Sequence, residues 1–225
     1  MLIIYISGID GCGKTTQSKL LVDTLVDRGL DVCYLWLRWE PSFRRMFRFF
    51  RLIIAGRKKN ENLDIQKVEN LVENNWLDFK RRVLTNAWIR KIWWFHACAD
   101  YYYSSRKRFR SLDAEIIVID RYLDDFIIDQ ACNLALPPER AYILANNIFL
   151  KRFMAPDLRI VIDLPASEGY ARKRDGTSLN YLKRRELYYK SLSASDNTVH
   201  LNGLDDVLSL AKQIESCARN MLAGL

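Results

Sequence analysis

The sequence lacks several features that would point to specialised classes of protein. Its 225 residues include only nine glycines and five prolines, with no internal repeat, low-complexity tract or flexible linker. Collagen-like and disordered chains are thereby excluded, and 49% apolar with 28% charged residues is typical of a folded globule. No apolar run approaches the ~20 residues that a membrane-spanning helix requires. The length suits one α/β domain, so we expect residues 1–225 to form a single domain.

The number and spacing of the cysteines argue against two kinds of site. There are five of them, an odd number, and none is spaced like a metal knuckle. A disulfide framework or a zinc site is therefore not expected, and a reducing cytoplasm is the predicted location. The N-terminal MLIIYISGIDG has no basic start and no small-residue cleavage site, so we interpret it as a buried strand and not as a signal peptide.

The net charge of +8 favours a polyanionic partner. Three partners meet that condition: nucleotide phosphates, nucleic acid and an anionic membrane surface. No nucleic-acid recognition motif is present, so nucleic-acid binding has only the net charge in its favour. We predict a small-molecule nucleotide as the partner and no nucleic acid.

Short apolar runs alternate with stretches of helical periodicity. Five runs are predicted strands: Leu2–Ser7, Val32–Leu37, Ile116–Asp120, Arg159–Asp163 and Thr198–Leu201. Helices are expected at 14–28, at about 76–109 and at 205–222, where apolar residues recur at helical spacing. Such alternation is typical of βαβ units. The predicted fold class is α/β: a five-stranded parallel sheet flanked by helices in three layers, as in P-loop NTPases.

One motif carries the chemistry. Residues 8–15 read GIDGCGKT and match GxxxxGK[ST], the phosphate-binding loop, between an apolar strand and a predicted helix. Glycines let the backbone aim N–H groups at a phosphate, and the helix N-terminus adds positive potential. Lys14 then reaches the β- and γ-phosphates of ATP, and the Thr15 hydroxyl is a Mg²⁺ ligand. The predicted nucleotide-binding residues are Gly8, Ile9, Asp10, Gly11, Cys12, Gly13, Lys14, Thr15 and Thr16.

Two further segments fit phosphoryl transfer from ATP–Mg²⁺. The strand 116–120 ends in Asp120, and an acid at the end of a strand that follows a P-loop holds the magnesium, usually through water. The segment 166–180 is a candidate lid, because it contains Arg172, Arg174 and a glycine and follows a strand. Cations around the transferring group supply much of the catalysis, although a solvated basic helix face has the same composition.

Taken together, these residues resemble the thymidylate kinase family of nucleoside monophosphate kinases. The resemblance runs in order along nearly the whole chain: GIDGCGKTT at the P-loop, RWEP at 38–41, DRY at 120–122, IDLP at 162–165, the lid arginines, and the closing strand and helix after Asn197. It implies phosphorylation of dTMP to dTDP by ATP. Asp10 would contact the acceptor sugar and Arg121 would bind the acceptor phosphate. The P-loop lacks an arginine that some members carry, and Arg172 or Arg174 of the lid would supply it.

The acceptor region departs from the family pattern. Arg-Glu-Pro-Gly-Gly is replaced by Arg38-Trp39-Glu40-Pro41-Ser42, so both Arg38 and other arginines are candidates for the second phosphate clamp. We expect 38–110 to be a helical acceptor-binding region with Phe95 against the base. The long helix has apolar residues at helical spacing: Phe79, Val83, Trp88, Ile92, Phe95, Ala99 and Tyr102. We expect most of this aromatic-rich helix to pack in the core, and a homodimer interface is the alternative.

Two alternatives to a dTMP kinase follow from the same residues. The first is a kinase of this fold with another nucleotide or a non-nucleotide acceptor. The second is a non-catalytic ATP-dependent protein that docks on a membrane or partner, because the segment 43–54 alternates arginine with aromatic and aliphatic residues as interfacial helices do. We favour a helix over the acceptor pocket for that segment.

Overall fold

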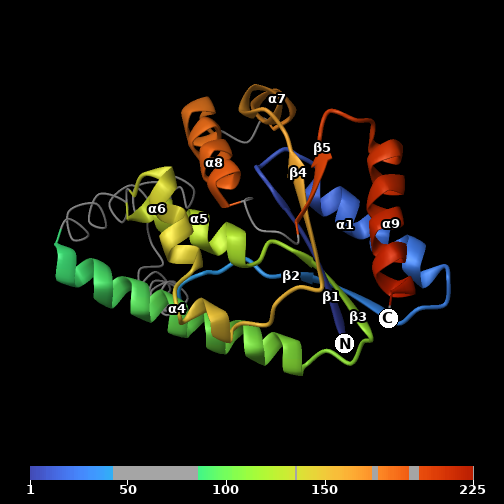
Figure 1. Ribbon diagram of the computed structural model, residues 1–225, viewed down its shortest axis with the longest axis horizontal. Helices are drawn as coiled ribbons and strands as arrows, with labels where there is room; N and C mark the ends of the chain where they lie inside the picture. The colour runs from blue at the N-terminus through green and yellow to red at the C-terminus, as the bar shows by residue number, and fades with distance from the viewer. Residues whose placement is uncertain (43–85, 135, 174–176, 193–197, 225) are drawn as a thin grey trace, which may run out of the picture. The chain divides into compact units, whose positions relative to one another are not determined.

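A computed structural model describes residues 1–42, 86–134, 136–173, 177–192 and 198–224. Its centre is a parallel sheet of five strands in the order β2-β3-β1-β4-β5 (Figure 1). The strands are β1 (Leu2–Gly8), β2 (Val32–Trp36), β3 (Ile116–Asp120), β4 (Leu158–Asp163) and β5 (Thr198–Asn202). All five predicted strands are confirmed to within one residue at either end.

The sheet forms because its central strands are apolar on both faces. β1 pairs in parallel with β3 on one side and β4 on the other, with Ile4 opposite Val118 and Ile6 opposite Ile160. Nearly every residue of β1 and all of β3 are buried, which is the pattern expected when helices cover both faces of a parallel sheet.

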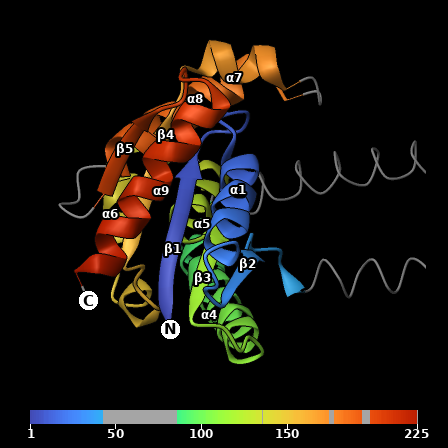
Figure 2. The same cartoon turned by 90° about the vertical axis from the view of Figure 1, so that its right-hand side faces the viewer.

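Helices cover the sheet in the three layers that the sequence predicts. α1 (Lys14–Val26) and α9 (Val207–Ala223) pack together on one face, and α5 (Leu123–Asn133) and α8 (Leu179–Leu192) lie on the other (Figures 1 and 2). The remaining elements are α6 (Pro138–Ala145), the 3₁₀ turn η1 (Leu150–Arg152) and α7 (Ala166–Arg172). This is a P-loop NTPase-type α/β fold. No described helix is long and apolar enough to cross a membrane.

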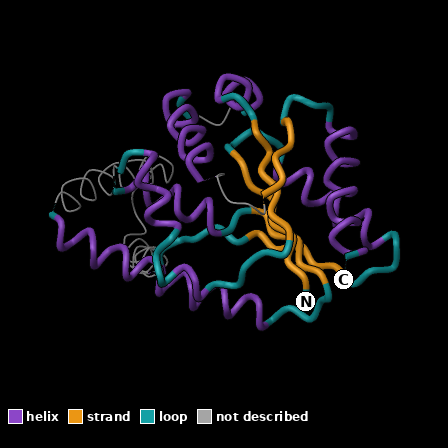
Figure 3. Tube along the Cα trace, in the orientation of Figure 1, coloured by secondary structure: helices purple, strands orange, loops and turns teal. Residues whose placement is uncertain are grey.

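The topology brings the loops of the site to one edge of the sheet. The strand order reverses at β1, whose neighbours come from later in the chain. Figure 3 shows the strands of the sheet side by side in orange. Ligands of open α/β sheets bind at such a switch point, beyond the carboxyl ends of the strands. The P-loop follows β1, Arg121 follows β3, α7 follows β4 and Gly203 follows β5. These four segments therefore meet, although the sequence separates them widely.

The chain divides into two compact units, Met1–Trp39 with Ser105–Leu225, and Glu40–Ser104. The long helix α4 runs over Ala87–Arg110, and its residues up to Ser104 belong to the second unit. It includes the end of the predicted helix 76–109, while Asn86 is a bend. The predicted segment 43–54 and the predicted helix residues 76–85 lie outside the described residues. The single-domain reading of 1–225 stays a prediction.

The buried face of α4 differs from the predicted one. Trp88, Ile92 and Phe95 are 73%, 66% and 57% exposed, so the expectation that they pack in the core is wrong. The buried positions are Trp94, Ala97, Cys98 and Tyr101, which recur at helical spacing. Apolar side chains occur on almost every side of this helix, so periodicity alone does not select the face that is buried.

Candidate functional site

The P-loop has the backbone that its glycines predict. Gly8, Gly11 and Gly13 all have positive φ angles, and Gly13 immediately precedes the first residue of α1. A side chain at Gly11 would meet the backbone of Gly169 in α7, because an added Cβ would lie 2.6 Å from that carbonyl oxygen. Ile9 and Cys12 are buried, whereas Thr15 and Thr16 are exposed at the start of α1. The loop thus directs backbone N–H groups outward from a helix N-terminus.

Lys14 is a buried cation inside this loop. Its side chain is 4% exposed, and its ammonium group donates to the carbonyl oxygens of Gly8 at 2.7 Å and Ile9 at 2.8 Å. Asp10 lies 3.8 Å away and partly balances the charge. The ammonium group is therefore held within the loop that would enclose a phosphate.

Thr15 and Asp120 meet as the sequence predicts for a magnesium site. The Thr15 hydroxyl donates to Oδ2 of Asp120, which is fully buried at the end of β3. Among the described residues, Oδ1 of Asp120 has no hydrogen-bond partner. A buried carboxylate oxygen without a donor, beside a hydroxyl on the P-loop, fits a hydrated Mg²⁺, which is bound through one or two carboxylates and water.

Tyr34 is a component of this site that the sequence analysis missed. It lies on β2, and its hydroxyl donates to Oδ2 of Asp120 at 3.1 Å. Burial, and then the negative charge of Asp120, raises the pKa of Tyr34 to about 12, so the hydroxyl keeps its proton and its role as donor. The register of the sheet places Tyr34 opposite Val118 on the neighbouring strand, and no sequence motif predicts this pairing.

Arg121 links the P-loop to the opposite face of the sheet. Its φ angle of 68° lies in the left-handed region, which costs a non-glycine residue about 1–2 kcal/mol. This turn after β3 directs its guanidinium toward two carboxylates: Nη2 binds Oδ1 of Asp10, and Nη1 donates to Oδ1 of Asp125 at 3.2 Å. Strained residues of this kind concentrate at functional sites.

The charges around Asp10 fix its ionisation. Burial acts to raise the pKa of Asp10, but the positive charges of Lys14 and Arg121 outweigh burial and hold the pKa well below its usual range. Desolvation likewise acts to lower the pKa of Arg121, but Asp125 and Asp10 outweigh it and raise that pKa. Both groups are therefore charged at neutral pH, and the guanidinium of Arg121 pairs with Asp10 of the P-loop as a cation.

Arg38 lies in the same cluster as Arg121. It follows β2, and its Nε is 3.5 Å from Oδ2 of Asp129 on α5, with 38% of the side chain exposed. The neighbouring Trp39 is buried, and its ring packs edge-on against Phe126 of α5, with centroids 5.6 Å apart. The tryptophan that departs from the family pattern thus anchors this segment on α5 and leaves Arg38 beside Asp129.

The lid arginines are only partly described. Arg172 ends α7 and donates from Nη1 to the carbonyl oxygen of Gly203 at 2.9 Å, in the loop after β5. Arg174 lies outside the described residues. Among the described lid residues, Lys173 pairs with the P-loop, since its Nζ is 4.0 Å from Oδ2 of Asp10. Sequence reasoning passed over Lys173 because it considered only the arginines.

Phe95 belongs to the unit Glu40–Ser104. It lies on α4 and is exposed. Its contact with a base stays a prediction.

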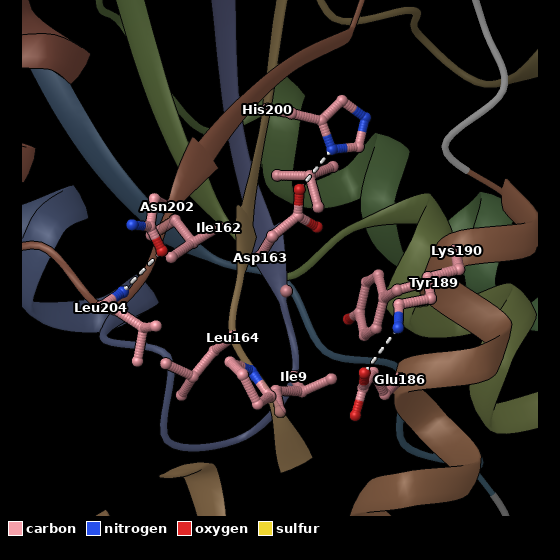
Figure 4. A pocket seen from close by; sticks show the side chains of 13 residues that line it. Ile9, Ile162, Asp163, Leu164, Glu186, Tyr189, Lys190, His200, Asn202 and Leu204 are labelled. Carbon is pink, nitrogen blue, oxygen red and sulfur yellow. Dashed lines mark hydrogen bonds and ion pairs between the residues drawn. The ribbon is translucent and has the colours of Figure 1, made fainter.

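A pocket of about 470 Å³ lies beside the P-loop but does not contain its phosphate-binding side chains (Figure 4). Gly8 and Ile9 contribute to one wall, and two ion pairs lie on the others: His200 Nδ1 with Asp163 Oδ2, and Lys190 Nζ with Glu186 Oε1, each at 2.7 Å. Lys14, Thr15, Asp120 and Arg121 do not line it. This pocket is therefore separate from the predicted phosphate-binding residues.

Known proteins were compared with the chain over its whole length. No family model matches the chain. A thymidylate kinase of Caldanaerobacter subterraneus subsp. tengcongensis is 26% identical over 98% of this chain and 96% of its own length. A probable thymidylate kinase of Pyrococcus horikoshii is 26% identical over 99% of this chain and 98% of its own, and one of Thermococcus onnurineus is 29% identical over 76% and 70%. With the fold and the P-loop described above, this similarity over nearly the full length supports the thymidylate kinase family for this chain.

Proposed function

We propose that this protein transfers the γ-phosphoryl group of ATP–Mg²⁺ to the phosphate of a nucleoside monophosphate, dTMP, giving dTDP and ADP. The observation that carries the proposal is the position of Arg121. Its guanidinium is held between Asp10 of the P-loop and Asp125 of α5, so a cation stands beside the phosphate-binding loop where it can orient an acceptor phosphate toward the γ-phosphorus. The thymidylate kinases that resemble the chain over its full length support dTMP as the acceptor.

The donor residues act on ATP by position and charge. Backbone N–H groups of the P-loop and the ammonium group of Lys14 bind the phosphate chain, and Lys14 exchanges its two loop carbonyls for phosphate oxygens. Thr15 and Asp120 would hold Mg²⁺, which when bound neutralises charge on the β- and γ-phosphates. The buried oxygen of Asp120 without a donor supports this assignment.

The acceptor residues orient the attacking oxygen. Arg121 binds the acceptor phosphate with Arg38 as a second cation, and Asp10 accepts a hydrogen bond from the sugar. An oxygen of the acceptor phosphate forms the new bond to the γ-phosphorus while the bond to the β,γ-bridging oxygen breaks, and ADP leaves. The lid, with Arg172, Arg174 and Lys173 as its cations, stabilises the charge of the transferring group and excludes water.

A coupled assay of ADP release tests the proposal. ATP–Mg²⁺ is presented with dTMP, dUMP, UMP, CMP, AMP and GMP in turn, and the nucleoside diphosphate products are identified by chromatography. Selective stimulation by dTMP, with dTDP formed in step with ADP, supports the proposal. ATP binding without stimulation by any of the six would overturn it in favour of a different acceptor or a non-catalytic role.

A further inference from the structure

We infer that Arg185 is a positioning residue for the acceptor clamp, acting through the two carboxylates that hold Arg121 and Arg38; this inference rests on the proposed function. Arg185 lies on α8 and its side chain is completely buried. Its Nη2 donates to Oδ1 of Asp125 at 3.3 Å, and its Nη1 donates to Oδ1 of Asp129. One guanidinium therefore bridges two acidic residues of α5.

Those two carboxylates are also the partners of the proposed acceptor arginines. Oδ1 of Asp125 accepts from Nη1 of Arg121 at 3.2 Å, and Oδ2 of Asp129 lies 3.5 Å from Nε of Arg38. Asp125 and Asp129 are four residues apart on α5, so they project from the same face of the helix. Loss of Arg185 would therefore change the positions of both acceptor arginines through the two carboxylates that they share with it.

The charge count gives Arg185 a role beyond packing. Asp10 has Lys14 at 3.8 Å and Lys173 at 4.0 Å in addition to Arg121. The two carboxylates of α5, Asp125 and Asp129, pair instead with Arg121, Arg38 and Arg185. Without Arg185, these two carboxylates would be balanced only by the two arginines that face the acceptor, so they would bind Arg121 and Arg38 more closely and leave both less available to a phosphate dianion.

The surroundings of Arg185 hold it charged and in one orientation. Tyr181 accepts a hydrogen bond from Nη1 at 3.1 Å, and the rings of Tyr181 and Tyr189 lie 5.6 and 5.9 Å from the guanidinium carbon. Desolvation acts to lower the pKa of Arg185, but Asp129 and the tyrosines outweigh it and raise that pKa. Nε is buried and has no hydrogen-bond partner among the described residues. The guanidinium is thus oriented so that its two Nη atoms reach the carboxylates, while Nε is left without a hydrogen bond.

Replacement of Arg185 by Met tests this role, because Met fills similar space without charge. We expect the KM for dTMP to rise about tenfold, the size of effect that follows when residues in one network are uncoupled. The KM for ATP should change less than about twofold, because the hydrogen-bond partners of Arg185 among the described residues are Asp125, Asp129 and Tyr181, and none of these is a predicted ATP-binding residue. Arg185→Lys keeps the charge and should raise the KM for dTMP less, and it carries the test if the Met variant does not fold.

Arg159 of β4 provides a matched control, because it pairs with a carboxylate of the same helix, α5. Arg159 pairs with Asp124, the neighbour of Asp125, through Nη2 at 2.7 Å and Nε at 2.9 Å, but it contacts neither Arg121 nor Arg38. Arg159→Met removes a guanidinium from a carboxylate of α5 in the same way, and it should lower stability while leaving the ratio of the two KM values unchanged. The double variant Arg185→Met/Asp129→Asn restores the charge balance and should recover part of the loss in KM for dTMP, which repacking alone would not achieve.

The outcomes separate the inference from the proposed function. Wild-type turnover of dTMP is measured first, and its absence overturns both. If the wild type turns over dTMP and Arg185→Met raises both KM values equally, or behaves as Arg159→Met does, the proposed function stands and the positioning role of Arg185 is wrong. A selective rise in the KM for dTMP, partly reversed in the double variant, supports the inference.

Discussion

The donor side of the site and the acceptor side are built in different ways. The donor side comes from nine consecutive residues, 8–16, together with Asp120 at the end of the adjacent strand. The acceptor side is assembled from widely separated segments: the P-loop, the end of β2, the turn after β3, α5 and α8. Binding a polyphosphate is the same task in every P-loop protein, whereas the acceptor differs, and this explains why one side is a short motif and the other a tertiary cluster.

The largest expected effect is on the donor side. Lys14→Ala should lower kcat by about 10²–10³-fold, as the loss of one preorganised group that stabilises transition-state charge does. Steady-state ADP release measures the effect, and circular dichroism checks that the variant is folded. A Lys14→Ala protein with normal turnover would remove the P-loop from the mechanism.

Changes on the acceptor side of the site should mainly alter the KM for dTMP. Arg121→Ala should raise the KM for dTMP by about 10–100-fold, because charge-assisted hydrogen bonds to the acceptor phosphate are lost. The KM for ATP should change far less. Full saturation curves for both substrates measure the two constants, and equal changes would contradict the division of the site into two sides.

A smaller effect is expected on the donor side, where Tyr34 donates to Asp120. Tyr34→Phe removes the hydroxyl that holds Asp120, and the magnesium concentration for half-maximal activity should rise about fivefold, the worth of one hydrogen bond. Turnover at saturating magnesium should stay within about twofold. Tyr170→Phe, in an exposed tyrosine of α7, is the control and should leave the magnesium titration unchanged.

The smallest effect concerns Asp10 and pH. Its pKa is held below the ordinary 3.8, so its ionised form adds stability above about pH 4, and this stability is lost as the pH falls through the folded-state pKa. The difference in unfolding free energy between the wild type and Asp10→Asn should therefore be constant from pH 5 to 8 and shrink below pH 4. Urea unfolding at several pH values measures it, and a slope between pH 5 and 8 would disagree with the charged pairs around Asp10.

Sequence alone was a reliable guide to the sheet. Strands such as Ile116–Asp120 are apolar on both faces, and this pattern distinguishes a buried parallel strand from an amphipathic element. The long helix α4 shows the opposite case. Trp88, Ile92 and Phe95 are exposed although their spacing suggested a core face, because tryptophan and tyrosine occur around most of the helix and give no single apolar stripe.

The acceptor cluster shows where sequence reasoning stopped. Asp125 and Asp129 follow the DRY triplet at helical spacing, so a search for acidic pairs on that helix would have found them. Arg185 and Tyr34 had no such signal, because each reaches the site only through the packing of α8 and the register of β2. Lys173 was overlooked for another reason, since only arginines were considered in the lid.

Residues 8–16 by themselves determined that the protein binds nucleotide phosphates, because glycines with positive φ before a helix N-terminus make an anion site wherever they occur. The apolar strands determined the parallel sheet. Tertiary structure decided which carboxylate shares each arginine, which side of α4 is buried, and that a buried arginine from α8 lies behind the acceptor clamp. The physical reason is distance along the chain: local patterns fix backbone geometry and burial, whereas charge pairing between residues 60 positions apart exists only after the helices have packed.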